Sequence, residues 1–103
     1  MKYEVEISDT AWADVDEAFE WLSQRAPQAA GRWRIELLEA IQQLESRPLR
    51  CSLAPESAYF NRPIRQLLYG KRQHKYRVLF TVNEGLVVVV RVRHGAQRPL
   101  GEK

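Results

Sequence analysis

Residues 75–94 read KYRVLFTVNEGLVVVVRVRH, and this stretch decides the fold. It is rich in β-branched and aromatic residues, which predicts strands from His74 to Val82 and from Leu86 to Arg93. Between them, Asn83-Glu84-Gly85 fits a three-residue hairpin loop with glycine in the left-handed position. The stretch therefore predicts an antiparallel hairpin near the C-terminal end of the chain.

The two faces of this predicted hairpin differ in character. With a three-residue loop, one face is apolar on both strands and is expected to meet the helices. The other face sets Arg77 opposite Arg91, and Lys75 opposite Arg93. Like charges directly across a ladder are destabilising, so this face is expected to hold an anion.

The sequence before the hairpin predicts a strand and then two helices. Residues 2–8 alternate apolar and polar side chains, as a half-buried strand does. Ser8-Asp9-Thr10 offers side chains that cap a first helix, and Pro27 ends it. The second helix is expected from Gln28 to Glu45, antiparallel to the first. Three tryptophans are expected in the core or between the helices: Trp12, Trp21 and Trp33.

The remaining segment completes the predicted topology. Residues 46–61 contain prolines and small polar residues and are expected to be irregular, whereas Pro63 to Tyr69 is expected to form a strand. The order β-α-α-β-β-β predicts an α+β domain, with an N-terminal helical hairpin packed on a small, largely antiparallel sheet. A single domain over residues 1–103 is expected.

Composition and charge narrow the class of protein. Among 103 residues, 45% are hydrophobic and 28% charged, as in an ordinary globular chain. The single cysteine, Cys51, excludes an internal disulfide, and no apolar run reaches the length of a membrane span, so a cytoplasmic protein is expected. Residues 1–45 carry a net charge of −6 and residues 46–103 one of +9. This asymmetry favours an acidic or polyanionic partner for the second half.

Five arginines are predicted to form an open basic surface on the sheet, one of them only if its strand register allows. The planar guanidinium suits phosphate and carboxylate alike. The competing interpretation is a solvated face whose arginines pair internally, with Glu56 or with acids of the first helix. The predicted surface comprises Arg65, Arg77, Arg91, Arg93 and Arg98, edged by His74 and His94, with Arg65 the conditional member.

The two histidines have different expected roles. His94 ends the arginine-rich strand, where it could serve as a general acid or base for RNA cleavage or could simply bond to backbone. His74 lies in a polar turn and is expected to be exposed without a functional role. Two histidines and one distant cysteine do not make a metal site, so we expect neither metal nor cofactor.

Taken in order, several segments resemble the RelE/ParE superfamily of bacterial toxins. They are Ile64-Arg65-Gln66-Leu67, the run KYRVLF at residues 75–80, and VVVRVRHGA at residues 88–96. The Pro55-Glu56 pair and the helix containing Trp33 to Leu44 agree with them. One departure is Gln97, which places Arg98 one position later than the resemblance leads us to expect.

The resemblance implies the toxin of a two-gene type II toxin–antitoxin module. The long helical hairpin and the sequence around His94-Gly95-Ala96 are similar to the ParE-like branch, often called plasmid stabilisation proteins. Members of that branch inhibit DNA gyrase and are not hydrolases. The resemblance therefore implies gyrase as the target and a cognate antitoxin as the partner, in a toxin–antitoxin hetero-oligomer.

Two alternatives remain open at this point. A RelE-like toxin would be a metal-independent endoribonuclease that cuts mRNA on the ribosome. Its implied catalytic residues are His94, Arg77, Arg93 and Arg65, with Glu56 as a base. The further alternative is a non-toxic binding module of the same fold. For either toxin, an acidic antitoxin segment that folds on binding is expected to cover Arg77 and Arg91.

Overall fold

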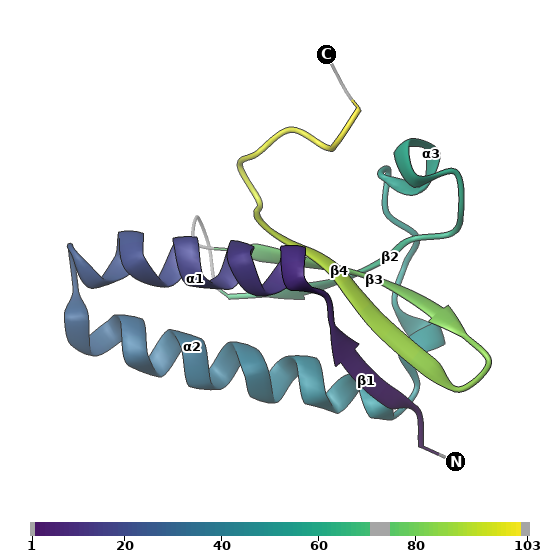
Figure 1. Cartoon of the computed structure of the whole chain (residues 1–103), viewed down its shortest axis with the longest axis horizontal. Coiled ribbons are helices and arrows are strands. Elements are labelled where there is room, and N and C mark those ends of the chain that lie inside the picture. Colours follow the sequence, from purple (N-terminus) through teal and green to yellow (C-terminus); the bar gives the residue numbers. More distant parts are fainter. Residues whose placement is uncertain (1, 71–74, 102–103) are drawn as a thin grey trace.

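A computed structural model describes residues 2–70 and 75–101 as a four-stranded mixed sheet with a helical hairpin on one face (Figure 1). A short helix and the C-terminal tail lie on the other face, so the predicted α+β architecture is confirmed. His74, expected to open the third strand, lies outside the described residues. The elements are β1 (Glu4–Ile7), α1 (Asp9–Ser23), α2 (Pro27–Gln42), α3 (Ser57–Phe60), β2 (Arg65–Tyr69), β3 (Tyr76–Asn83) and β4 (Leu86–His94), with 3-10 turns at Gln43–Glu45 and Pro48–Arg50.

The two long helices begin where the sequence predicts. The Ser8 hydroxyl accepts a hydrogen bond from the Ala11 N–H at 3.1 Å and so caps α1. Pro27 is the first residue of α2, where its missing N–H costs nothing. The hairpin covers the sheet with a core centred on α2 and β3; its fully buried members include Val15, Leu37, Ile41, Val78 and Phe80.

The sheet has the order β1-β4-β3-β2. β1 runs parallel to β4, and the β4–β3 and β3–β2 pairs are antiparallel. On the face away from the helical hairpin, Ala54, Ile64 and Leu79 form a second, smaller cluster. This cluster anchors the segment that leads into α3 against the sheet.

The hairpin register expected from a three-residue loop is wrong. Asn83 pairs with Leu86, which leaves Glu84 and Gly85 as a two-residue turn, both with positive φ (45° and 81°). A two-residue turn with this geometry matches the right-handed twist of the flanking strands. This turn and a bulge farther along β4 together place Arg77 opposite Arg93.

A bulge in β4 changes the register once more. Leu79 pairs with Arg91 and Phe80 pairs with Val89, so Val90 has no partner on β3. Val90 packs instead against the smaller cluster, while Val89 and Val92 both belong to the core beneath the helices. The bulge therefore places Arg91 and Arg93 on the same face of the sheet as Arg77.

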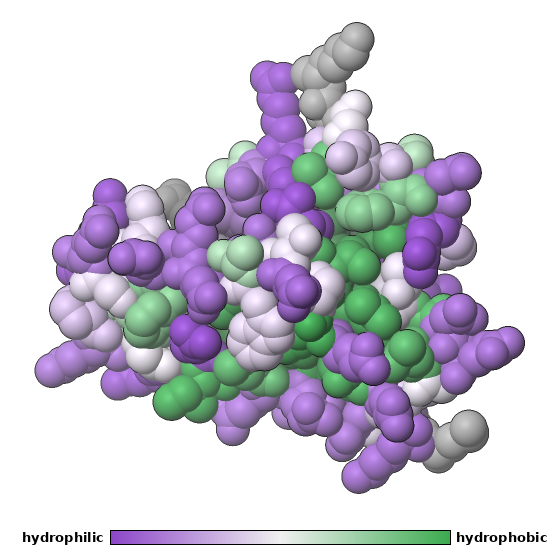
Figure 2. Space-filling model, in the orientation of Figure 1, coloured by the Kyte–Doolittle hydropathy of each residue, from purple (hydrophilic) through white to green (hydrophobic). Residues whose placement is uncertain are grey.

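Exposure also differs from expectation at one tryptophan. Trp33 packs against the core as expected, but Trp21 near the end of α1 is 50% exposed. Figure 2 shows hydrophilic side chains along the helical hairpin and apolar ones gathered over the strands beside it. Within the described ranges, no helix combines the length and the apolar character that crossing a bilayer requires.

Candidate functional site

A closed ion pair lies on the sheet face beside α3. Arg77 Nη1 and Nη2 donate to the two carboxylate oxygens of Glu56, each at 2.7 Å. Arg77 also donates from Nε and Nη2 to the Gln66 side-chain oxygen, at 3.0 and 2.7 Å. The Glu56 side chain is wholly buried and that of Arg77 is 11% exposed. Both partners are therefore held inside the protein with their hydrogen bonds made.

The turn before α3 places Glu56 there. The Ala54 N–H donates to the Ile64 carbonyl at 2.7 Å, and the Ser57 hydroxyl oxygen lies within hydrogen-bond distance of the Ala54 and Ile64 carbonyl oxygens, at 2.8 and 3.1 Å. The Ile64 N–H in turn donates to that hydroxyl. These local bonds close the loop between residues 54 and 64, so the carboxylate is presented to the sheet by a rigid segment.

Two opposed effects act on the acidity of Glu56. Burial raises the pKa of a carboxyl group, but the hydrogen bonds and charge of Arg77 outweigh it. The pKa of Glu56 is therefore held below its ordinary value, and the group is a carboxylate at neutral pH. Because the Glu56 carboxylate is buried and hydrogen-bonded to Arg77, neither of its oxygens is accessible to solvent.

The C-terminal tail covers this pair. Arg93, opposite Arg77 in the ladder, donates from Nη2 to the Arg98 carbonyl at 2.9 Å. The Leu100 N–H approaches Glu56 Oε2 at 3.4 Å. Arg93 Nε is buried and finds no hydrogen-bond partner among the described residues. Among the described residues, the carboxylate that pairs with these two arginines is Glu56, bound to Arg77, and the tail adds the Arg98 carbonyl and the Leu100 N–H.

A second arginine–carboxylate pair lies where β4 meets α1, and its arginine, Arg91, shares the sheet face of Arg77. Arg91 donates to Asp14 from Nε at 2.7 Å and from Nη2 at 3.0 Å. Asp14 also accepts the Val92 backbone N–H at 2.9 Å. The hydrogen bond to Asp14 raises the pKa of Arg91 despite partial burial. This pair locks α1 to the bulged strand.

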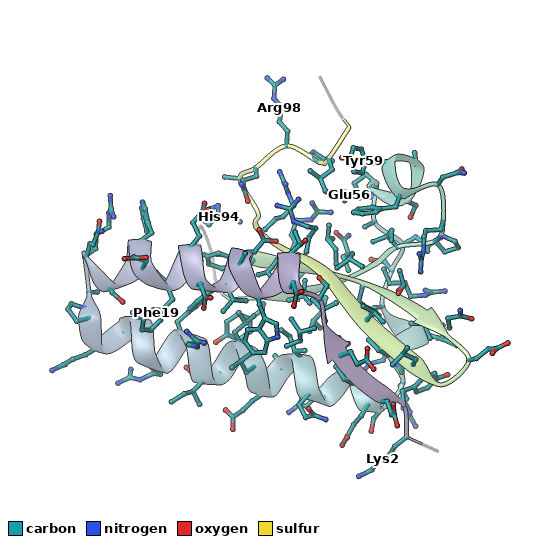
Figure 3. The ribbon with its side chains drawn as sticks, viewed as in Figure 1. Lys2, Phe19, Glu56, Tyr59, His94 and Arg98 are labelled. Carbon is teal, nitrogen blue, oxygen red and sulfur yellow. The ribbon has the colours of Figure 1, made fainter. Side chains whose placement is uncertain are left out.

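Arg65 and Arg98, two further arginines of the predicted surface, lie away from both of these ion pairs. Arg65 pairs with Phe80 across the ladder, which puts it on the face opposite that of Arg77. Its Nη1 donates to the carbonyls of Leu49 and Cys51, at 3.2 and 2.6 Å. Arg98 is exposed, and Figure 3 shows its side chain pointing away from the fold.

His94 lies apart from Glu56, on the α1 side of the tail (Figure 3). Its Nδ1 accepts the Ala96 N–H at 3.0 Å, and its ring packs edge-on against Tyr76. It borders a groove of about 480 Å³ between α1 and the end of β4. The groove is lined by Asp14, Glu17, Ala18, Trp21, Tyr76, Arg91, Val92, His94 and Gln97.

Comparison with known proteins places this arrangement in a family. Residues 5–99 match the sequence model of a family described as the ParE toxin of the type II toxin–antitoxin system, parDE. The chain belongs to the ParE toxin family. No curated protein sequence matches it.

Two solved structures share the fold of this ParE-family chain. A chain of the chromosomal ParDE toxin–antitoxin system from P. aeruginosa aligns with a TM-score of 0.71 at 15% identity, covering 90% of this chain and 96% of that one. A chain of the RelBE2 toxin–antitoxin complex from Mycobacterium tuberculosis aligns with a TM-score of 0.55 at 19% identity, covering 91% and 99%. At these identities the likeness is one of fold.

The ParE fold brings together only part of the residue set singled out from the sequence. Arg77, Glu56 and Arg93 meet beneath the tail, as the competing interpretation of internal pairing partly foresaw. Arg65 lies at another edge of the sheet, while Arg91 and His94 border the groove beside α1. The described part of the chain contains no group of three His, Cys, Asp or Glu side chains that could hold a metal ion.

Sequence reasoning missed the groove and the residues that form it. Asp14 lies between Ala11 and Val15, the buried residues of α1, and this position brings its carboxylate close to the sheet. The hydrophobicity of Trp21 predicts a place in the core or between the helices, whereas its position near the end of α1 leaves it half exposed. The 50% exposure of this large aromatic is the signal that marks the groove as a surface feature.

Proposed function

We propose that this ParE-family toxin acts by inhibiting DNA gyrase, and that a cognate antitoxin neutralises it in a toxin–antitoxin complex. The proposal includes action in the cytoplasm, where both partners would be met. It is an interaction mechanism: the toxin would bind a protein target and would not cleave RNA.

The observation that carries the proposal is the closed Arg77–Glu56 pair. A general base must reach the proton that it removes, within about 3 Å or through one water. Glu56 is wholly buried, and its two oxygens accept hydrogen bonds from Arg77 and Leu100. This geometry favours a structural carboxylate over a catalytic one.

The other candidate catalytic groups are dispersed in a way that supports the same conclusion. An endoribonuclease needs arginines aimed at the scissile phosphate beside its acid and base. Arg65 is turned to the carbonyls of Leu49 and Cys51, and Arg77 to Glu56 and Gln66. His94 lies on the far side of the tail from Glu56 (Figure 3).

The test is pulse labelling of DNA, RNA and protein synthesis after brief induction of the toxin without antitoxin. Gyrase inhibition predicts that DNA synthesis falls before protein synthesis and that purified toxin changes gyrase-dependent cleavage or supercoiling. His94→Ala should leave this effect within about threefold of the unmodified toxin, because no reaction step passes through the imidazole.

The opposite result would reassign the activity. If protein synthesis falls first and His94→Ala removes the effect, the RelE-like endoribonuclease is the better description. If neither synthesis falls while the protein accumulates, the chain is a non-toxic binding module of this fold. In each case the accumulated protein is measured, so poor expression is not mistaken for lost toxicity.

A further inference from the structure

The segment that follows α2 presents two leucines to solvent between arginines. We call residues 47–53 the basic turn; it lies beside the start of β2. Pro48 is fully buried, whereas Leu49 and Leu53 are 54% and 56% exposed. Arg47 and Arg50, on either side of the first leucine, are also exposed. Single exposed leucines are ordinary, but two in one short segment with arginines beside them are typical of a surface that meets another protein.

The backbone of the basic turn is held rigidly by the sheet. Arg65 Nη1 donates to the carbonyls of Leu49 and Cys51, at 3.2 and 2.6 Å. The Ser52 carbonyl accepts the Gln66 N–H at 3.0 Å. The turn is therefore ordered before any partner arrives, so docking through it costs little conformational entropy.

Arg47, which opens the turn, has a strained backbone. Its φ of 53° lies in the left-handed region, which an arginine rarely adopts. The residue that follows, Pro48, is fully buried, so this unusual conformation is imposed by packing. Backbone strain persists only where surrounding contacts impose it, and it is concentrated at functional sites.

The arginines of the basic turn and its neighbour in β2 have no acidic partner, unlike the two paired arginines of the sheet. Within residues 2–70 and 75–101, no carboxylate forms an ion pair with Arg47, Arg50 or Arg65. Burial raises the pKa of the Cys51 thiol, and the charges of Arg50 and Arg65 oppose that rise, so both guanidinium groups lie close to this thiol. The exposed leucines are therefore accompanied by positive charge that the fold does not neutralise.

These properties favour a folded protein as the partner. Nucleic acid would pair with the arginines but would leave both leucines in water. A segment that folds on binding needs a groove to lie in, and the groove beside α1 includes no residue of the basic turn. A rigid, exposed turn fits instead against a depression on a protein that is already folded, with acidic side chains around an apolar centre.

We propose that the basic turn is the surface through which this toxin binds its protein target, gyrase. Leu49 and Leu53 supply the apolar contact, Arg47 and Arg50 pair with acidic side chains of the target, and Arg65 is a positioning residue that holds the turn. The inference rests on the proposed function and adds the surface of the toxin that performs it.

The experiment measures inhibition of purified gyrase by the full toxin chain in a supercoiling assay. Leu49→Ser and Arg50→Glu should each raise the toxin concentration for half-inhibition by about tenfold or more, since one removes an apolar contact and the other reverses a charge. The matched controls at exposed positions of α2 are Ile35→Ser, where the isoleucine is 63% exposed, and Arg32→Glu; both should stay within about threefold of the unmodified toxin. Because all four residues are exposed, each variant is expected to fold, which urea unfolding checks.

A cross-linking measurement tests the contact directly. The photoreactive residue p-benzoylphenylalanine, placed at position 49 or 53, should join the toxin to a gyrase subunit on irradiation. The same residue at position 35 should not, and an excess of unmodified toxin should suppress the product at positions 49 and 53. A specific cross-link would not follow from a general change in the charge or stability of the toxin.

Each other outcome has a defined meaning. If Leu49→Ser inhibits gyrase as well as Ile35→Ser does, or if positions 49 and 53 form no cross-link, the basic turn is not the target surface and the inference is overturned. If only Arg50→Glu loses inhibition and the unmodified toxin binds naked DNA with a steep salt dependence, the turn contacts nucleic acid and the inference is wrong. If the folded, unmodified toxin does not inhibit gyrase at all, the proposed function fails first, and the inference fails with it.

Discussion

The α3 side and the α1 side of β4 each hold an arginine–carboxylate pair, yet they serve different purposes. On the α3 side, the side chains of Arg77 and Glu56 are 11% and 0% exposed, and the tail lies over them. On the α1 side, Arg91 and Asp14 are 27% and 17% exposed and border an open groove. The same type of ion pair is therefore buried inside the protein in one region and partly exposed at the surface in the other.

The comparison indicates that burial, and not residue type, determines whether an arginine of this fold has a purely structural role or remains accessible at the surface. A guanidinium and a carboxylate removed from water hold each other strongly, since either one alone would be a buried unpaired charge. A pair in contact with solvent is worth less to stability, but its neighbours remain accessible. Four predictions test this contrast, from the largest expected effect to the smallest.

Removing the charge of Glu56 should be the most damaging change. Glu56→Gln leaves the Arg77 guanidinium buried without a counter-charge, which we expect to lower the free energy of unfolding by about 3 kcal/mol or more. Urea unfolding followed by tryptophan fluorescence measures the loss. Glu20→Gln on the exposed surface of α1 is the control and should change stability by less than about 0.5 kcal/mol. A loss at position 56 as small as the control's would contradict a closed pair.

Acid should remove the same contribution by titration. The pKa of Glu56 lies below its ordinary value near 4.5, so the pair stabilises the folded state fully above that pH. The contribution is lost as the pH falls through the folded-state pKa. The stability gap between the unmodified protein and Glu56→Gln should therefore narrow between about pH 5 and pH 2. Urea unfolding of both proteins across this range checks it, and a constant gap would show that Glu56 is not the titrating group.

The α1-side pair should tolerate the equivalent change better. Asp14→Asn keeps an oxygen for the Val92 N–H and loses only the charge opposite Arg91. We expect a loss of about 1–2 kcal/mol, because both side chains retain contact with water. The same urea experiment gives the value. A loss equal to that of Glu56→Gln would remove the contrast between the two regions.

The smallest effect concerns the turn that sets the register of β3 against β4. Glu84 has a φ of 45° in the two-residue turn, a conformation that asparagine adopts more readily. Glu84→Asn should raise the free energy of unfolding by about 0.5 kcal/mol, whereas Glu84→Val should lower it. Parallel thermal and urea unfolding measures both. Equal stabilities for all three proteins would indicate that the turn does not fix the register.

Much of the fold follows from local patterns. The alternation of Tyr3, Val5 and Ile7, the Ser8 cap and the position of Pro27 predict β1 and the starts of α1 and α2, and each is confirmed. These features depend on residues close together in the chain, whose conformational preferences act before any distant contact forms. The resemblance to RelE/ParE toxins rests chiefly on later segments, at residues 64–67, 75–80 and 88–96, and the family match confirms it.

The candidate site was less predictable, because its residues meet across the fold. One residue at a turn and one at a bulge changed the partners of Arg77, Arg91 and Arg93. A shift of one residue exchanges the two faces of a strand, and nothing in the strand sequence alone marks Val90 as the extra residue.

The sequence by itself determined the order of the four strands and the two long helices, the family and the charge contrast between the two halves of the chain. Only the tertiary structure decided which acids neutralise which arginines, and which aromatic side chain stays in contact with solvent. The physical reason is range: helix caps and strand alternation act over a few residues, whereas Arg77–Glu56 and Arg91–Asp14 join positions 21 and 77 residues apart. Pairing over such separations is selected by the packed fold, in which the register of β3 and β4 is fixed.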